Sequence, residues 1–151
     1  MLVDANVLLF AVNEDSAQHV RARDWINEQL NGNRRVGLPW QVLGSFLRMA
    51  THPRAFERPL DAKRAWRLVT EWLCSPVAWV PEPGVRHAAL LGGLIERYDL
   101  RGNLIPDGQL AALALEHGLT MQSADTDFAR FEELRWENPV APGRATPPHG
   151  S

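Results

Sequence analysis

The sequence is poor in several residue types, and each scarcity limits what the protein can be. Cys74 is the single cysteine among 151 residues, so the chain can form no internal disulfide and no zinc site built on thiolates. This usage fits a reducing compartment, and we expect the cytoplasm. No apolar stretch approaches the length of a membrane span, and no basic segment precedes the apolar N-terminus. We therefore predict a protein that is neither membrane-bound nor exported.

Lysine is almost absent as well. Lys63 is the single lysine among 16 basic residues, and the others are arginines, whose planar guanidinium suits phosphate oxygens and base faces. The net charge of -2 does not give the basic character by which many nucleic-acid-binding proteins are recognised. A local arginine patch beside an acidic pocket is compatible with this charge balance.

Hydrophobic residues make up 45% of the chain, which is enough for one domain with a core of its own. Across residues 1–140, short apolar runs alternate with stretches whose apolar residues recur at helical spacing. This alternation predicts an α/β sandwich with a mostly parallel sheet. The predicted strands lie at the N-terminus and near residues 35–38, 78–80, 119–122 and 135–137. Residues 141–151 are rich in proline, glycine and small polar residues, and we predict a disordered tail there.

Helices are predicted between these strands from apolar spacing and from residues that begin or end helices. Asp61 is the expected N-cap of one of them, and Trp66 is expected on its buried face, as a core residue rather than a stacking platform for nucleobases. Residues 98–106 are predicted to form a polar loop that leads to a helix at Asp107. The predicted helices span residues 6–12, 17–30, 40–51, 62–73 and 85–97, with a further one ending before Gly118.

The first stretch of the chain reads M-L-V-D-A-N-V-L-L and is typical of a strand buried on both faces of a parallel sheet. It contains an acid, Asp4, near the point where the strand is expected to end. A carboxylate in apolar surroundings is unfavourable by several kcal/mol unless a cation, a helix N-terminus or a basic group compensates it. At the carboxyl edge of an open α/β sheet, where ligands bind, Asp4 is a candidate site residue.

Three more acids lie at the boundaries between predicted strands, loops and helices. Asp107 precedes a predicted helix, whereas Asp125 and Asp127 follow the predicted strand at 119–122. If these segments meet Asp4 at one edge of the sheet, the carboxylates repel one another unless a cation neutralises them. Oxygen ligands without histidine or cysteine favour Mg²⁺ or Mn²⁺ over zinc. Such a site suits hydrolysis of phosphodiesters.

The residues around these acids admit two interpretations. Asn6 and Ser123 are candidates to orient the N-terminal acid or a water on the metal. Each of the other acids also has a structural explanation, since Asp107 can cap a helix and Asp125 and Asp127 can stabilise a turn. The N-terminal acid is harder to explain in this way, because it interrupts a buried strand.

Four segments, in this order, carry a further signal: V-D-A-N-V-L-L, then L-P-W-Q-V-L-G-S-F-L-R-M-A-T-H-P-R-A-F, then L-I-P-D-G-Q-L-A-A-L-A-L-E-H-G, and finally S-A-D-T-D-F-A-R-F. They resemble signature regions of PIN-domain ribonucleases, specifically of VapC-type toxins from bacterial toxin–antitoxin pairs. Any one segment is a weak signal, but four with fitting separations across residues 1–140 are a strong one. The resemblance implies a three-layer α/β/α sandwich around a sheet of four to five strands.

The resemblance also implies an activity and a set of partners. The activity is that of a Mg²⁺-dependent endoribonuclease, with Mn²⁺ as a substitute, acting on structured RNA such as tRNA or rRNA. Asp4, Asp107 and Asp125 match the metal-binding catalytic acids of the family, with Asp127 as a supporting ligand. A cognate VapB-type antitoxin would cover the toxin and fill its acidic pocket, often with an arginine. Family members also form homodimers through their helices, and with the antitoxin they form hetero-oligomers.

One position departs from the family pattern. Most members carry a glutamate on the helix after the second strand, where this chain has Ser45. Serine brings no charge, so a second metal should bind more weakly. Three possibilities follow for such an enzyme: it uses one metal, it recruits another acid such as Glu14 or Asp15, or it turns over slowly.

Contacts to RNA phosphates are expected from arginines near the carboxyl edge of the sheet. An arginine on a helix face is often simply solvated, so each is a candidate only. The candidates are Arg48, Arg54, Arg101 and Arg130.

Two other functions compete with a nuclease. A phosphatase of the haloacid dehalogenase kind also begins with a strand ending in aspartate, but it requires an acid where this chain has Asn6, and Lys63 lies in a helix without a site motif. A receiver domain fails for similar reasons. A PIN-like module that lost turnover with Ser45 and binds RNA or protein predicts poor Mg²⁺ binding and intact RNA.

Overall fold

The computed structural model describes residues 1–142. Its centre is a five-stranded sheet in the order β3-β2-β1-β4-β5, and every pair of neighbouring strands is parallel. Flanking backbone bonds extend the short ladders, as where Leu2 N and Asp4 N donate to Thr120 O and Gln122 O, each at 2.9 Å. The predicted parallel sheet is confirmed. The strands are β1 (Leu2–Val3), β2 (Val36–Gly37), β3 (Ala78–Trp79), β4 (Met121–Gln122) and β5 (Trp136–Glu137).

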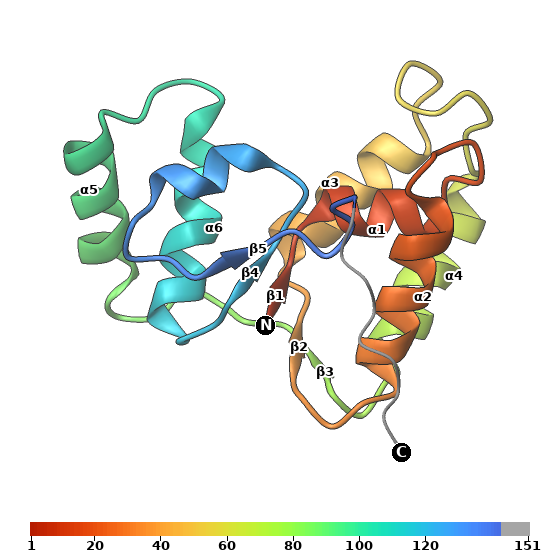
Figure 1. The fold of residues 1–151 in the computed structure, drawn as a ribbon, viewed down its shortest axis with the longest axis horizontal. Helices are drawn as coiled ribbons and strands as arrows, with labels where there is room; N and C mark the ends of the chain where they lie inside the picture. The colour runs from red at the N-terminus through yellow and green to blue at the C-terminus, as the bar shows by residue number, and fades with distance from the viewer. Residues whose placement is uncertain (143–151) are drawn as a thin grey trace.

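Helices cover both faces of this sheet. Figure 1 shows α1 to α4 gathered on one side of the sheet and α5 and α6 on the other, which confirms the three-layer α/β/α sandwich. A short 3₁₀ helix, η1, connects β4 to β5. The bounds are α1 (Ala5–Val12), α2 (His19–Leu30), α3 (Trp40–Ala50), α4 (Ala62–Leu73), α5 (His87–Tyr98), α6 (Leu104–Glu116) and η1 (Thr126–Arg130).

The N-terminal stretch is buried as its composition predicts. Val3, Val7 and Leu8 are completely buried and belong to the hydrophobic core, which holds β1 and α1 between the other elements. Asp61 is confirmed as the N-cap of α4, since its Oδ1 accepts a hydrogen bond from Arg64 N at 2.8 Å. Local signals therefore fix the start of the sheet and the start of α4.

The start of α6 differs from the prediction, and the difference concerns the site. The helix begins at Leu104, inside the segment predicted as a polar loop, with Asn103 as its N-cap. Pro106 is the third helical residue, where the backbone N–H has no intrahelical partner, so proline does not break the helix. Asp107 lies in the first turn, and its interpretation as the N-cap is wrong.

Trp66 is a second difference. α4 buries Ala65, Val69 and Trp72, while Trp66 lies beside that stripe and is 48% exposed. The expectation that Trp66 belongs to the core is therefore wrong.

The last described residues are held against α2. Arg21 Nη1 donates to Val140 O at 3.2 Å and to Ala141 O at 3.1 Å, and Val140 is buried. Except for residues 141 and 142, the predicted disordered tail lies outside the described residues. Among residues 1–142, no helix is both long enough and apolar enough to cross a lipid bilayer.

Candidate metal centre

The sheet has a topological switch point between β1 and β4. The chain leaves β1 for β2 on one side, whereas β4, on the other side, is reached only after β3. In open α/β sheets, ligands bind outside the carboxyl ends of the strands at such a point. Asp4 follows β1 and Ser123 follows β4, so both lie there.

Three hydrogen-bond donors hold the carboxylate of Asp4. Its Oδ1 accepts from Ala5 N at 2.8 Å, while its Oδ2 accepts from Ser123 Oγ at 2.7 Å and from Asn6 Nδ2 at 3.3 Å. Burial raises the pKa of Asp4, the hydrogen bonds from Ser123 and Ala5 lower it, and the charge of Asp125 raises it again. The net pKa is raised above the usual aspartate value, because burial is the largest of these effects.

Asn6 and Ser123 also connect Asp4 to the loop after β4. Asn6 Nδ2 donates to Ser123 Oγ at 3.1 Å, and Asn6 Oδ1 accepts from Ala124 N at 3.1 Å. The buried Ser123 hydroxyl further accepts from Asp125 N at 3.0 Å. The two residues that the sequence suggested as orienting groups thus join the end of β1 to the turn that carries Asp125.

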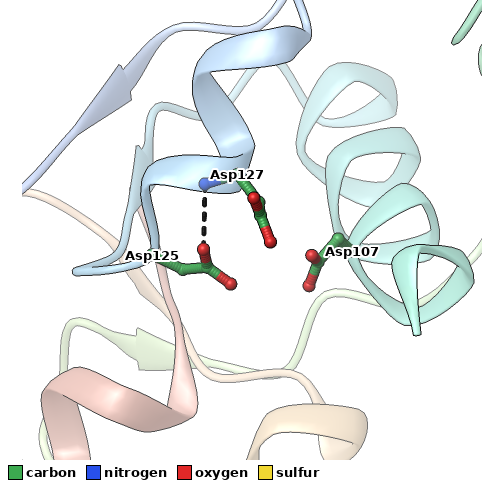
Figure 2. A group of neighbouring side chains, drawn as sticks. All are labelled: Asp107, Asp125 and Asp127. Carbon is green, nitrogen blue, oxygen red and sulfur yellow. Dashed lines mark hydrogen bonds between the residues drawn. The ribbon is translucent and has the colours of Figure 1, made fainter.

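The other three acids converge in front of α6. One carboxylate oxygen each of Asp107, Asp125 and Asp127 lies within 4.8 Å of the others. Figure 2 shows Asp107 pointing from the first turn of α6 toward Asp125 and Asp127. Asp125 is the N-cap of η1, and its Oδ1 accepts from Asp127 N at 2.9 Å. The convergence predicted from the sequence is confirmed for this acid cluster, that is, for Asp107, Asp125 and Asp127.

Burial and the charges of neighbouring acids raise the pKa of one member of this acid cluster. Burial raises the pKa of Asp107 to about 6, and the charges of Asp125, Asp4 and Asp127 contribute in the same direction. Asp4 therefore lies near the acid cluster, although it is not one of the three acids whose oxygens meet. Crowded carboxylates are stabilised by a cation, and oxygen donors alone suit Mg²⁺ or Mn²⁺. The residues present fit a hard divalent ion.

Of the four predicted RNA-binding arginines, only Arg130 is seen in contact with one of these acids. Its Nε donates to Asp127 O at 3.1 Å and its Nη2 lies 3.4 Å from Asp127 Oδ1. Its charge lowers the pKa of Asp107. Arg101 pairs with Asp99 instead. The other two, Arg48 near the end of α3 and Arg54 in the loop after it, are exposed and make no side-chain hydrogen bond or ion pair to these acids within residues 1–142.

The structure also bears on the departure at Ser45. Asp15, a candidate substitute for the missing glutamate, forms an ion pair with Arg58, with 2.7 Å between Asp15 Oδ1 and Arg58 Nη2. Asp15 and Glu14 line a separate pocket with Arg58. Neither belongs to the acid cluster found among residues 1–142, so neither of these two acids replaces the missing glutamate there.

One contact near the site was not foreseen. Gln41 Nε2 on α3 donates to Pro106 O at 3.1 Å, in the turn that carries Asp107. It links the first turns of α3 and α6. A glutamine early in a helix gives no sequence signal for such a long-range bond.

Comparison with known proteins gives a consistent result. The family profile described as "PIN domain" matches residues 1–134. Ribonuclease VapC37 of Mycobacterium tuberculosis is 44% identical over 140 residues, which cover 93% of this chain and 97% of the relative. Ribonuclease VapC33 of the same species is 39% identical over 140 residues, covering 93% and 98%.

Solved structures share the fold. VapBC2 from Rickettsia felis, bound to a DNA fragment from its promoter, matches with a TM-score of 0.64 and 16% identity, covering 91% of this chain and 96% of that one. VapC20 of Mycobacterium tuberculosis, described as a Sarcin-Ricin loop cleaving toxin, matches with a TM-score of 0.62 and 19% identity, covering 85% and 92%. At such identities the likeness shows a common fold.

Proposed function

Because this chain belongs to the PIN-domain family and, within it, to the VapC ribonucleases, we propose that it is a Mg²⁺-dependent endoribonuclease toxin acting on structured RNA such as tRNA or rRNA. Mn²⁺ is expected to replace Mg²⁺. The observation that carries the proposal is the acid cluster, whose oxygens lie within 4.8 Å of one another at the carboxyl edge of the sheet. Relatives named as ribonucleases support the assignment of RNA as substrate.

In this proposal, Asp107, Asp125 and Asp127 hold the ion and Asp4 completes the set from the end of β1. When bound, the ion would polarise the phosphoryl oxygens and help to ionise the attacking water. Asp107 is largely ionised at neutral pH despite its pKa of about 6, so it is ready to bind a cation. Asp4, Asp107 and Asp125 are the proposed catalytic acids.

The remaining side chains at the site position these acids and the RNA. Ser123 and Asn6 fix the orientation of the Asp4 carboxylate through the hydrogen bonds to its Oδ2. Arg130, which contacts Asp127, is proposed to bind a phosphate oxygen of the RNA. Arg48, Arg54 and Arg101 are exposed and stay proposed contacts to more distant phosphates.

The proposed partners follow from the same site. A VapB-type antitoxin with a basic group would complement the acid cluster and block it. Structures of VapBC complexes share this fold, which is compatible with such an assembly. We also propose a homodimer through the helices and a toxin–antitoxin hetero-oligomer, in the cytoplasm where the RNA is.

Cleavage of RNA by antitoxin-free protein tests the proposal. We expect total RNA to be cut when Mg²⁺ or Mn²⁺ is added and not in EDTA, and Asp107→Asn to abolish cutting without changing the circular dichroism spectrum. Asp24→Asn, an exposed acid of α2, is the matched control and should cut normally. RNA that is bound but left intact at every metal concentration would favour the binding module instead.

A further inference from the structure

Two tryptophans are exposed together on the helical layer. Trp40, the first residue of α3, is 49% exposed and Trp66 of α4 is 48% exposed. Their rings are stacked, with centroids 6.4 Å apart and an angle of 15° between the planes. Large aromatic side chains left in water are unfavourable for a folded chain, and exposed groups of them mark binding surfaces.

Trp40 also lines a groove of about 500 Å³. The groove lies between the start of α3, the connection from β3 to α5, and α6, and its walls include Pro39, Trp40, Pro81 and Leu113. His87 lines it too, and its Nδ1 atom is buried without a hydrogen-bond partner among the described residues. The groove therefore has largely apolar walls, and the unpartnered His87 Nδ1 lies buried behind its surface.

Two glutamines in the groove lining relate the groove to α6, the helix that carries Asp107. Gln41 lines the groove and donates to Pro106 O, in the helical turn of Asp107. Gln109 lines the groove from α6, two residues after Asp107. A ligand in the groove would thus lie beside the first turn of α6, which carries one of the proposed catalytic acids.

The charged residues around the groove indicate where the phosphates and where the bases of an RNA strand can bind. Exposed Lys63 and Arg67 flank Trp66 on α4, whereas Glu82 is an acid in the groove lining. An anionic phosphate is favoured beside Trp66 and disfavoured inside the groove. A neutral, planar base fits the groove, where it can stack on Trp40.

We propose that this groove receives an unpaired base of the RNA, stacked on Trp40 with Trp66 behind it, while neighbouring phosphates contact Lys63 and Arg67. The inference rests on the proposed function, because it takes RNA as the substrate. It adds a requirement: the RNA must present a single-stranded nucleotide next to the bond that is cut.

Binding of RNA oligonucleotides tests this inference apart from cleavage. In an Asp107→Asn background that leaves the RNA intact, a fluorescently labelled single strand should bind about tenfold more weakly to Trp40→Ala and to Trp66→Ala. A tenfold loss corresponds to about 1.4 kcal/mol, which is the size of effect expected when one base no longer stacks on an aromatic ring. Trp66→Phe should restore most of the affinity, Val85→Ala, exposed on the β3–α5 connection, should leave it unchanged, and binding of a duplex should not respond.

A second variant does not depend on the tryptophans. Lys63→Gln with Arg67→Gln should reduce the slope of log affinity against log salt concentration by about 1–2, because two phosphate contacts are lost. In the active protein, the Trp40→Ala change should raise KM more than it lowers kcat. Normal thermal unfolding of each variant confirms that its fold is intact.

The outcomes separate this inference from the proposed function. If the parent protein cuts RNA and the tryptophan and basic variants bind single strands as tightly as the parent does, the inference is overturned and the nuclease stands. If those variants instead lose antitoxin binding or self-association in size-exclusion chromatography, with RNA binding unchanged, the groove is a protein interface and the inference is also overturned. If no RNA is cut under any metal condition, the proposed function fails, and the inference about the groove is then decided by the binding of single strands alone.

Discussion

The hydroxyl of Ser123 donates a 2.7 Å hydrogen bond to Asp4 Oδ2, and so joins residues 119 positions apart in the chain. The same hydroxyl accepts from Asp125 N at 3.0 Å. One buried side chain thereby fixes the acid at the end of β1 and the start of the turn after β4. The geometry of the proposed metal centre therefore depends on this connection as well as on the acids.

Removing the Ser123 hydroxyl should therefore weaken metal binding. Ser123→Ala deprives Asp4 of the hydrogen bond that most lowers its pKa and leaves Asp125 N without its partner. We expect metal affinity to fall about 10- to 100-fold, as for other groups that orient metal ligands, and the free energy of unfolding to fall by about 1–3 kcal/mol. Titration calorimetry with Mn²⁺ and denaturant unfolding measure the two effects.

A serine far from the acids provides the control. Ser75 Oγ donates to Leu30 O at 2.6 Å, so Ser75→Ala should lower stability without changing Mn²⁺ affinity. Equal Mn²⁺ affinity in Ser123→Ala and the parent would contradict the positioning role of Ser123.

Metal affinity should depend on pH through Asp107. Its pKa is raised to about 6 by burial and by the neighbouring acids, and only the ionised carboxylate binds a cation. We expect Mn²⁺ affinity to rise from about pH 5 to pH 7 and to change little above that. A flat affinity profile over this range would show that Asp107 is not a ligand.

The same pKa shift predicts that Asp107 destabilises the metal-free protein. The folded pKa lies above the usual value of 3.8, so the folded state holds the proton more tightly than the unfolded state. The resulting stabilisation is present at low pH and is lost as the pH rises through about 4 to 6. In EDTA at pH 7.5, Asp107→Asn should raise Tm by a few degrees, with a smaller difference below pH 4. A lower Tm for the variant at both pH values would contradict the claim that ionised Asp107 destabilises the metal-free protein.

Arg130 should shift the pH profile of metal binding. Its charge lowers the pKa of Asp107, so Arg130→Ala should move the rise in Mn²⁺ affinity to higher pH. Arg130→Lys keeps the charge and should shift it less. Arg23→Ala, on α2, removes an arginine paired with Asp24 and should leave the profile in place. An unshifted profile for Arg130→Ala would refute the proposed electrostatic effect.

Glu116 fixes the start of α5 from the end of α6. Its Oε1 and Oε2 accept from Gly84 N at 2.7 Å and from Arg86 N at 3.0 Å, and the bond from Gly84 is the main cause of its lowered pKa. A lowered pKa means stability that is present above the usual value of 4.5 and is lost as the pH falls below it.

Glu116→Gln should consequently lower Tm at pH 7, and the difference from the parent should shrink toward pH 3.5. Glu96→Gln, at an exposed position on α5, is the matched control and should leave Tm unchanged at both pH values. Thermal unfolding of the two variants side by side decides whether the contact of Glu116 with the β3–α5 connection stabilises the fold.

Much of the fold could be predicted because its signals are local. The buried N-terminal run, the N-cap at Asp61 and the alternation of strands with helices all rest on short stretches of sequence. The start of α6 was missed because Pro106 suggests a loop, and only the backbone shows that it occupies a position where a helix tolerates proline.

The site was predictable where acids follow strands and less so where contacts are long-range. Asp4 and Asp125 follow β1 and β4, whose carboxyl ends share one edge of the sheet, whereas Asp107 reaches this edge from the first turn of α6. The bond from Gln41 to Pro106 O and the exposure of Trp66 depend on how helices pack, which helical spacing does not reveal.

A crystal structure of the protein soaked in Mn²⁺, with an anomalous difference map, tests the central claim most directly. We predict one strong peak within coordination distance of carboxylate oxygens of Asp107 and Asp125 or Asp127, with Asp4 facing the same ion, and no such peak in Asp107→Asn crystals. A map without a peak at these acids, or with the ion bound elsewhere on the molecule, would contradict the claim that they form a metal centre.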